Sequence, residues 1–326
     1  MADNTKIEWA DATVNAVNGC SVLSPGCTNC YAMRLAGTRM KSHPSRAGLT
    51  RDSKAGPVWT GEVRLNEKAL LDPLRWKRPR RIFWNAHGDP FHKAVPDAWI
   101  DRMFASCALT PQHTHMILTK RSARMREYME PYSQRRADGL GAAVRLLGYQ
   151  GPLESLPTWP LRNVCLGVSV EDQARADERI PDLLATPAAV RFISAEPLLG
   201  PVDLKRFAPR DRYYMTRCEH CGWTGSSECC DLDRGWDDAD VVCPACHRTI
   251  MADEYDDKLD WVIVGGESGP GARPMQNDWA QSLVDQCKAA GVAVFVKQLS
   301  SGGPRAIKDL DAFPEGLRVR ELPNAR

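Results

Sequence analysis

Short apolar runs that alternate with helical stretches constrain the fold of this 326-residue chain more than any other sequence feature. The runs are rich in β-branched and aromatic residues and have no polar face, which is typical of strands buried on both sides of a parallel sheet. They lie at residues 81–86, 114–119, 163–168, 190–195, 259–264 and 292–296. A weaker first strand is expected near residues 7–9 or 59–63.

Helices fit between these runs. Residues 95–109 place Trp99, Met103 and Phe104 on one face, and residues 278–290 show a similar apolar stripe that ends at Gly291. Alternation of strand and helix over six or seven strands predicts a parallel α/β fold.

Polar residues follow nearly every predicted strand, which favours a partial or complete (β/α) barrel over a doubly wound sheet. In a barrel the carboxyl ends of the strands share one mouth, where sites are built. The alternative is that strand ends are polar simply because loops are polar. The residues concerned are Asp89, His92, Lys120, Arg121, Ser169, Glu171, Glu196, Glu267, Lys297 and Gln298. We expect most of them to line one cavity.

Twelve cysteines are the strongest compositional signal. No apolar run approaches the ~18 residues of a membrane span, and no apolar signal stretch begins the chain, so a cytoplasmic protein is expected. In that compartment clustered cysteines indicate metal binding or catalysis rather than disulfides. Cys107, Cys165 and Cys287 lie apart from the clusters and are interpreted as small core residues.

The first cluster, Cys20, Cys27 and Cys30, has the spacing C-x6-C-x2-C. Gly19, Pro25 and Gly26 permit the tight turns that would let three thiolates converge. Three ligands from one loop suit an iron–sulfur cluster, and a [4Fe–4S] cluster held in this way keeps one iron open for a small molecule. A structural zinc with a distant ligand, or free thiols, are the alternatives.

The second cluster consists of two C-x2-C pairs, Cys218 with Cys221 and Cys243 with Cys246. This spacing is typical of a zinc ribbon. It lies in an expected insertion at residues 211–257, within a barrel made of residues 1–210 and 258–326. Cys229, Cys230, His220 or His247 could replace a ligand or bind a second metal, and disulfide or redox use is the remaining alternative.

Charge is unevenly distributed although the net charge is only +2. Residues 34–81 contain 13 Lys/Arg against 4 Asp/Glu, a net of +9, whereas residues 228–257 contain 10 Asp/Glu against 2 Arg, a net of −8. The basic region is a candidate nucleic-acid interface. Its run at 75–81 is also explained as the solvated end of a helix. The acidic insertion is expected to be a structural element or a contact for a protein partner.

Several segments resemble a phage-associated, radical S-adenosylmethionine (SAM)-like protein family. They are Thr5-Lys-Ile-Glu-Trp9, Gly26-Cys-Thr-Asn-Cys-Tyr-Ala32, Gly88-Asp-Pro-Phe-His92, Leu118-Thr-Lys-Arg121, Leu166-Gly-Val-Ser-Val170, Ser194-Ala-Glu-Pro-Leu-Leu-Gly-Pro201 and Trp261-Val-Ile-Val-Gly-Gly-Glu-Ser-Gly-Pro270. The resemblance implies a partial barrel of the radical-SAM type. It also implies a [4Fe–4S] cluster on Cys20, Cys27 and Cys30, reduced by an external electron donor, which cleaves SAM to a 5′-deoxyadenosyl radical.

The resemblance also implies roles for residues at the mouth. Asp89, in the segment that begins at Asn85, would accept the SAM amine, and Lys120 or Arg121 would pair with its carboxylate. Ser169 and Glu171 would hydrogen-bond the ribose. The further cofactor-site candidates are Tyr31, Glu196 and Glu267.

The chain departs from the usual radical-SAM pattern. The first cysteine gap is six residues rather than three, Asn29 precedes the last cysteine, and Gly265-Gly-Glu267 comes too late to bind the SAM amine. The expected function is therefore a radical-SAM-like enzyme of unknown substrate, with a nucleic acid or nucleotide preferred. The alternative is a non-catalytic iron–sulfur or zinc module that binds nucleic acid or a partner protein.

Overall fold

The computed structural model describes residues 2–3, 5–129, 134–157, 160–207, 215–218, 220–226, 231–234, 239–250 and 258–323. Contacts divide the chain into two compact units. The first unit is Met1–Leu204 with Leu259–Arg326, and the second is Lys205–Lys258. Each is described by itself below.

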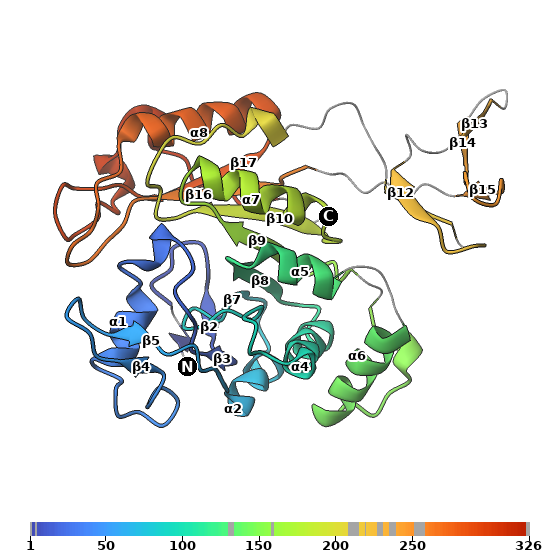
Figure 1. The fold of residues 1–326 in the computed structure, drawn as a ribbon, viewed down its shortest axis with the longest axis horizontal. Coiled ribbons are helices and arrows are strands. Elements are labelled where there is room, and N and C mark those ends of the chain that lie inside the picture. The colour runs from blue at the N-terminus through green and yellow to red at the C-terminus, as the bar shows by residue number, and fades with distance from the viewer. Residues whose placement is uncertain are drawn as a thin grey trace. The chain divides into compact units, whose positions relative to one another are not determined.

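The first unit is built on a parallel half-barrel sheet, which confirms the expected α/β class (Figure 1). Its strands follow the order β1-β2-β7-β8-β9-β10-β16-β17, and all neighbours are parallel except β1 and β2. The strands are β1 (Ala2–Asp3), β2 (Ala12–Val14), β7 (Arg81–Trp84), β8 (Thr114–Thr119), β9 (Val164–Ser169), β10 (Val190–Ala195), β16 (Trp261–Gly265) and β17 (Ala293–Gln298). The six apolar runs therefore correspond to β7, β8, β9, β10, β16 and β17.

The prediction for the first strand was wrong. The first parallel strand is β2, which pairs with β7, whereas residues 7–9 precede it and Trp59 belongs to a separate two-stranded hairpin. The strand was missed because it has only three residues and contains Thr13 and Ala12, so it lacks a distinctive apolar run. Trp9 is buried in the core instead.

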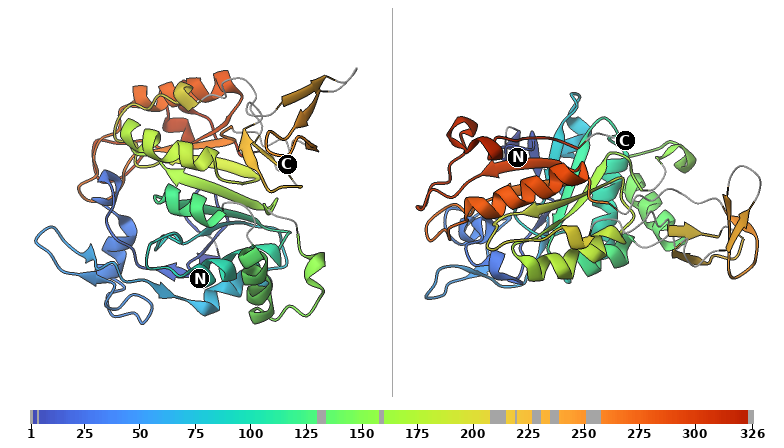
Figure 2. Two further views of the ribbon diagram at one scale, coloured as in Figure 1. Left: turned by 45° about the vertical axis from the view of Figure 1, so that its right-hand side comes forward. Right: turned by 90° about the horizontal axis from the view of Figure 1, so that it is seen from above.

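Helices cover the outer face of the sheet (Figures 1 and 2). α7 contacts β9 and β10, while α8 contacts β16 and β17. The principal helices are α1 (Tyr31–Gly37), α4 (Asp97–Ala108), α5 (Ser122–Met129), α6 (Gln134–Leu146), α7 (Gln173–Leu184) and α8 (Asn277–Ala290). The two expected helices correspond to α4 and α8. Among the helices described, none combines the length and apolar character needed to cross a membrane.

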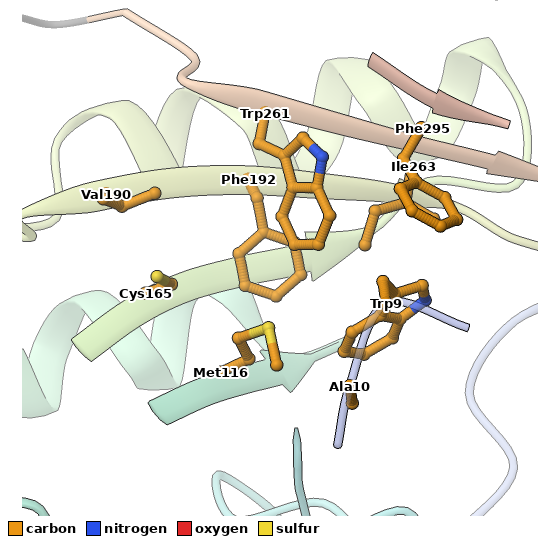
Figure 3. Close-up of a cluster of buried hydrophobic side chains, with 9 residues drawn as sticks. All are labelled: Trp9, Ala10, Met116, Cys165, Val190, Phe192, Trp261, Ile263 and Phe295. Atoms are coloured by element: carbon orange, nitrogen blue, oxygen red, sulfur yellow. The ribbon is translucent and has the colours of Figure 1, made fainter. Parts of the chain in front are cut away.

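The inner face carries an aromatic core (Figure 3). Trp261 lies edge-on to Trp9 and Phe295, with ring centroids 5.9 Å and 6.3 Å away. Alternate residues of each strand point to this face, because side chains in a strand alternate between the two faces of the sheet. The buried cluster comprises Trp9, Ala10, Met116, Cys165, Val190, Phe192, Trp261, Ile263 and Phe295. The outer positions pack under the helices, so both faces of the sheet are buried.

Short elements lie between β2 and β7. β3 (Val17–Asn18) pairs with β6 (Arg64–Leu65), and β4 (Thr50–Arg51) pairs with β5 (Val58–Trp59). Two short helices, α2 (Glu67–Leu70) and α3 (Asp72–Arg75), lead into β7. The basic region at 34–81 therefore consists largely of small hairpins and turns.

The described part of the second unit contains short antiparallel strands and a 3-10 helix, Lys205–Phe207. β11 (Met215–Arg217) pairs with β12 (Thr224–Ser226). β14 (Ala239–Val242) lies between β13 (Asp231–Arg234) and β15 (Thr249–Ile250). Its described core cluster is Cys218 and Cys243, packed against Trp223 and Cys246.

Candidate iron–sulfur and metal sites

The three-cysteine loop lies between β3 and α1, at the carboxyl edge of the sheet. A bridge between Gly19 and Gly88, which follows β7, brings the chain to this edge. The loop then turns through a short 3-10 helix, Pro25–Cys27, and the amide of Cys27 donates to the carbonyl of Ser24 at 2.9 Å. Proline at the start of this turn presets its backbone. Local sequence therefore folds the loop, and its place in the unit depends on the contacts that follow.

The first anchor joins the loop to the residues after β7 and β8. The guanidinium of Arg121 donates to the Ser21 hydroxyl at 2.9 Å, and His92 Nε2 lies 2.9 Å from the same oxygen. Arg121 also pairs with Asp89 at 2.7 Å, and Thr119 donates to Asp89 at 2.7 Å. Asp89 thus holds the arginine that holds the loop.

The second anchor joins the loop to Glu171, which follows β9 and is 0% exposed. The Ser24 hydroxyl donates to its carboxylate, which also pairs with Lys120 at 2.6 Å and Arg179 at 2.8 Å. Burial acts to raise the pKa of Glu171, but the charges of Lys120 and Arg179 outweigh it and hold the pKa below its ordinary value. The carboxylate is therefore ionised at neutral pH.

Gly26 permits this second anchor. A Cβ at Gly26 would lie only 2.4 Å from the nearer carboxylate oxygen of Glu171. No real side chain tolerates that distance, so the loop approaches Glu171 as backbone alone.

The third anchor joins the loop to Glu267, which follows β16. Asn29 donates to Glu267 at 2.9 Å, and Arg273 pairs with the same carboxylate at 2.5 Å. Arg273 also donates to the carbonyl of Pro25 at 2.9 Å. Three strand ends that are distant in sequence thus fasten one eleven-residue loop, Cys20 to Cys30, across the mouth of the half-barrel.

Three other expected site residues, Asn85, Glu196 and Ser169, have partners outside the cysteine loop. Asn85 is buried and accepts from the Val17 amide at 2.7 Å, so it supports the chain just before the loop. Glu196 pairs with Lys297 at 2.8 Å. The carbonyl of Ser169 accepts from Arg179 at 2.8 Å.

Tyr31 directly follows the last cysteine of the loop and is 69% exposed. Its ring centroid lies 6.1 Å from that of His87. Of the cofactor-site candidates, Asp89, Lys120, Arg121, Glu171 and Glu267 therefore meet at the loop.

Sequence reasoning missed most of the residues that complete these anchors. Ser21, Ser24 and Asn29 lie inside the cysteine loop. Arg179 lies on α7, 8 residues after Glu171 in sequence. Their position between the cysteines was the available signal for the first three. Arg179 and Arg273 carried no such signal, because their partners are set by tertiary contacts.

The three thiols of the loop are largely shielded from water. Cys27 is buried, and Cys20 and Cys30 pack against the apolar cluster of Met33, Leu49 and neighbouring side chains. Burial, assisted by the charge of Asp89, raises the pKa of Cys20 to about 12, and burial also raises the pKa of Cys30. Without a metal, Cys20 and Cys30 are protonated thiols and weak nucleophiles.

The loop cysteines do not form a compact ligand group for a single ion. Around one tetrahedral zinc, sulfurs lie about 3.8 Å apart for Zn–S distances of ~2.3 Å. The described residues contain one group of three or more His, Cys, Asp or Glu ligand atoms within 4.8 Å of one another, and the loop cysteines are not in it. In an iron–sulfur cluster each thiolate binds a different iron, so the loop cysteines remain candidate cluster ligands.

That one group is the four-cysteine cluster of the second unit. The sulfurs of Cys218 and Cys246 lie 3.4 Å apart, and those of Cys221 and Cys243 lie 3.6 Å apart. Although burial acts to raise it, hydrogen bonds from backbone amides and from Cys246 lower the pKa of Cys218 to about 7. These four residues could hold a metal ion such as zinc. Cys229 and Cys230 lie outside the described residues.

The two turns of this cluster have matching backbones. The Gly222 amide donates to the Cys218 carbonyl at 2.8 Å, and the His247 amide donates to the Cys243 carbonyl at 2.8 Å. Both Gly222 and His247 have positive φ, at 77° and 55°. Two equivalent turns of this kind place two sulfurs each on opposite sides of one centre, as in a zinc ribbon.

Comparison with known proteins gives a family but no activity. No curated protein and no solved structure matches the chain. Residues 4–316 match DUF5131, a family described as "Protein of unknown function". Because this match spans both the half-barrel and the cysteine-rich unit, the chain belongs to the DUF5131 family.

Proposed function

We propose that the protein is a radical-SAM-like iron–sulfur enzyme. The observation that carries this proposal is the three-cysteine loop, fastened by Arg121, Glu171 and Glu267 across the carboxyl edge of a parallel half-barrel. Carboxyl edges are where α/β barrels build their sites. Three thiolates are the ligand set for a [4Fe–4S] cluster with one open iron.

Cys20, Cys27 and Cys30 would hold the cluster. When bound and reduced by an external one-electron donor, it supplies the electron that splits SAM into methionine and a 5′-deoxyadenosyl group, which takes one hydrogen atom from the substrate. The chain's own part is to fix the loop and exclude water. Asp89 and Glu171 act through Arg121 and Ser24, so they are positioning residues in this scheme.

The engagement of these residues supports a revised assignment of SAM contacts. Asp89 with Arg121, and Glu171 with Lys120 and Arg179, already form ion pairs, so each of these side chains is engaged within the protein. The Ser169 hydroxyl has no hydrogen-bond partner among the described residues, and Tyr31 is exposed beside Cys30. Ser169 and Tyr31 are therefore our preferred cofactor contacts.

We further propose a nucleic acid or nucleotide as the substrate. Arg39, Arg51 and Lys54 follow the cysteine loop in sequence, are exposed, and form no ion pair with any described residue. Unpaired cations of this kind suit phosphates. The run at 75–81 leads into the amino end of β7, at the other edge of the sheet, so it is not part of this proposed surface.

The test begins with anaerobic purification, followed by iron, sulfide and zinc analysis. We expect about four irons per chain in the wild type, with charge-transfer absorbance that Cys27→Ala removes. Cys107→Ala is the matched control, because Cys107 is a buried helix residue far from the loop in sequence, and it should keep the iron.

SAM cleavage then separates an enzyme from a binding module. With dithionite as electron donor, the iron-loaded protein should release 5′-deoxyadenosine and methionine in equal amounts. An iron-loaded protein that leaves SAM intact would favour the alternative function, a non-catalytic iron–sulfur module. A protein that binds no iron after reconstitution would refute both.

A further inference from the structure

A pocket of about 330 Å³ opens at the amino edge of the half-barrel, the edge opposite the cysteine loop. Its lining includes the first residues of four parallel strands. They are Arg81, Thr114, Val190 and Trp261. A volume near this value is within the range of small-molecule sites.

The floor of the pocket is apolar. Met116, Cys165, Val190 and Trp261 line it and also belong to the inner core cluster of Figure 3. The pocket therefore ends on packed core, and a flat apolar body would rest against it. One wall comes from Leu322, which is 40% exposed although it lines an apolar hollow.

The rim of the pocket is cationic. Arg81 and Arg162 line it, and the lining includes no Asp or Glu. Arg162 is exposed and forms no ion pair with any described residue, whereas Arg81 shares its charge with Asp11 at 2.8 Å. A guanidinium with unused donors is suited to a carboxylate, which it binds through two parallel hydrogen bonds.

The geometry points to a second binding site, for a small aromatic carboxylate, at the amino edge of the half-barrel. The aromatic body contacts the apolar floor, and the carboxylate pairs with Arg162 at the rim. This site is independent of the cysteine loop and of any reaction proposed there.

The probe is 2-naphthoate, titrated into the purified full-length protein by isothermal titration calorimetry. We expect one site per chain, and at least tenfold weaker binding of the uncharged analogue 2-naphthamide, because a charge-assisted hydrogen bond is lost. Equal affinity for the two probes, or no binding of 2-naphthoate, would overturn the proposal.

Two variants locate the site. Thr114→Trp places a bulky ring at the exposed rim of the pocket and should abolish binding, while Thr114→Ser should not. Arg162→Gln should weaken binding about tenfold. Arg305→Gln is its control, since Arg305 is also exposed but lies outside the lining, and it should bind as wild type does.

Wild-type affinity in Thr114→Trp would place the probe elsewhere and refute the site. Circular dichroism of the same variant checks that it is folded, and both Thr and Trp favour strands. Cys27→Ala should bind 2-naphthoate normally, which keeps the outcome separate from that of the iron–sulfur proposal.

Discussion

The two cysteine clusters of this protein are held by opposite means. In the second unit the described core is the cysteines themselves, with sulfur pairs only 3.4 and 3.6 Å apart. In the first unit the core is a large cluster of apolar side chains, and hydrogen bonds and ion pairs from distant strand ends hold the loop.

This difference implies that a metal would stabilise the fold of the second unit, whereas in the first unit the fold would position the metal. Four sulfurs complete a tetrahedron around zinc and leave no open position. Three thiolates leave one iron of a cluster unliganded by protein. The predictions below test whether the two sites are as independent as this comparison implies.

The largest effect is expected from the double variant Cys218→Ser, Cys221→Ser. Structural zinc can contribute on the order of 10 kcal/mol to folding, so losing two ligands should release zinc and unfold Lys205–Lys258 locally. Zinc analysis and hydrogen exchange measure both effects. Loss of iron absorbance in the same variant would show that the clusters are coupled, which would break the comparison.

Glu171→Ala should destabilise the first unit by about 3–5 kcal/mol, because it leaves Arg179 and Lys120 as buried or half-buried cations without their carboxylate. Chemical denaturation measures the loss. Glu196→Ala is the control, since it also removes one partner of an ion pair at a strand end but does not touch the loop. Equal iron loading in the two variants would contradict the anchoring role of Glu171.

Gly26→Ala should separate the loop from Glu171 without removing any charge. The added Cβ would meet the carboxylate at 2.4 Å, and overpacking of this kind costs about 1–3 kcal/mol. The iron content per chain should fall by a larger fraction than the free energy of unfolding does. Gly303→Ala, where the added Cβ has its nearest neighbour at 3.8 Å, should leave both unchanged.

The smallest effect concerns pH. The pKa of Glu171 and that of Glu267 are held below the ordinary value of 4.5, so both carboxylates stabilise the fold above that pH. Their contribution is lost as the pH falls below about 4.5, with a slope of up to ~1.4 kcal/mol per pH unit for each proton taken up. In Glu267→Gln the slope of unfolding free energy between pH 5 and 3 should be smaller than in wild type. An unchanged slope would mean that Glu267 titrates normally.

The periodicity of the chain was enough to predict the α/β class and six strands, because strands buried on both faces appear in a sequence as continuous apolar runs. It was not enough for β2, whose three residues carry no such run. The stretch at 131–162 is rich in Gly, Pro and Arg, a composition typical of a surface insertion. Its helix α6 packs Ala143 and Val144 against Ala105, a contact that no local pattern encodes.

The cysteine spacings indicated both candidate metal sites, since the two residues of a C-x2-C pair lie close together whatever the rest of the chain does. Only the tertiary structure decided what the carboxylates at the mouth do. Glu171 and Glu267 are predicted to contact a cofactor, and the structure adds that they pair with Arg179 and Arg273 and fasten the loop. The strength of such polar contacts depends on distance and burial, and the fold brings together groups 100 or more residues apart in sequence, such as Ser24 and Glu171 with a separation of 147.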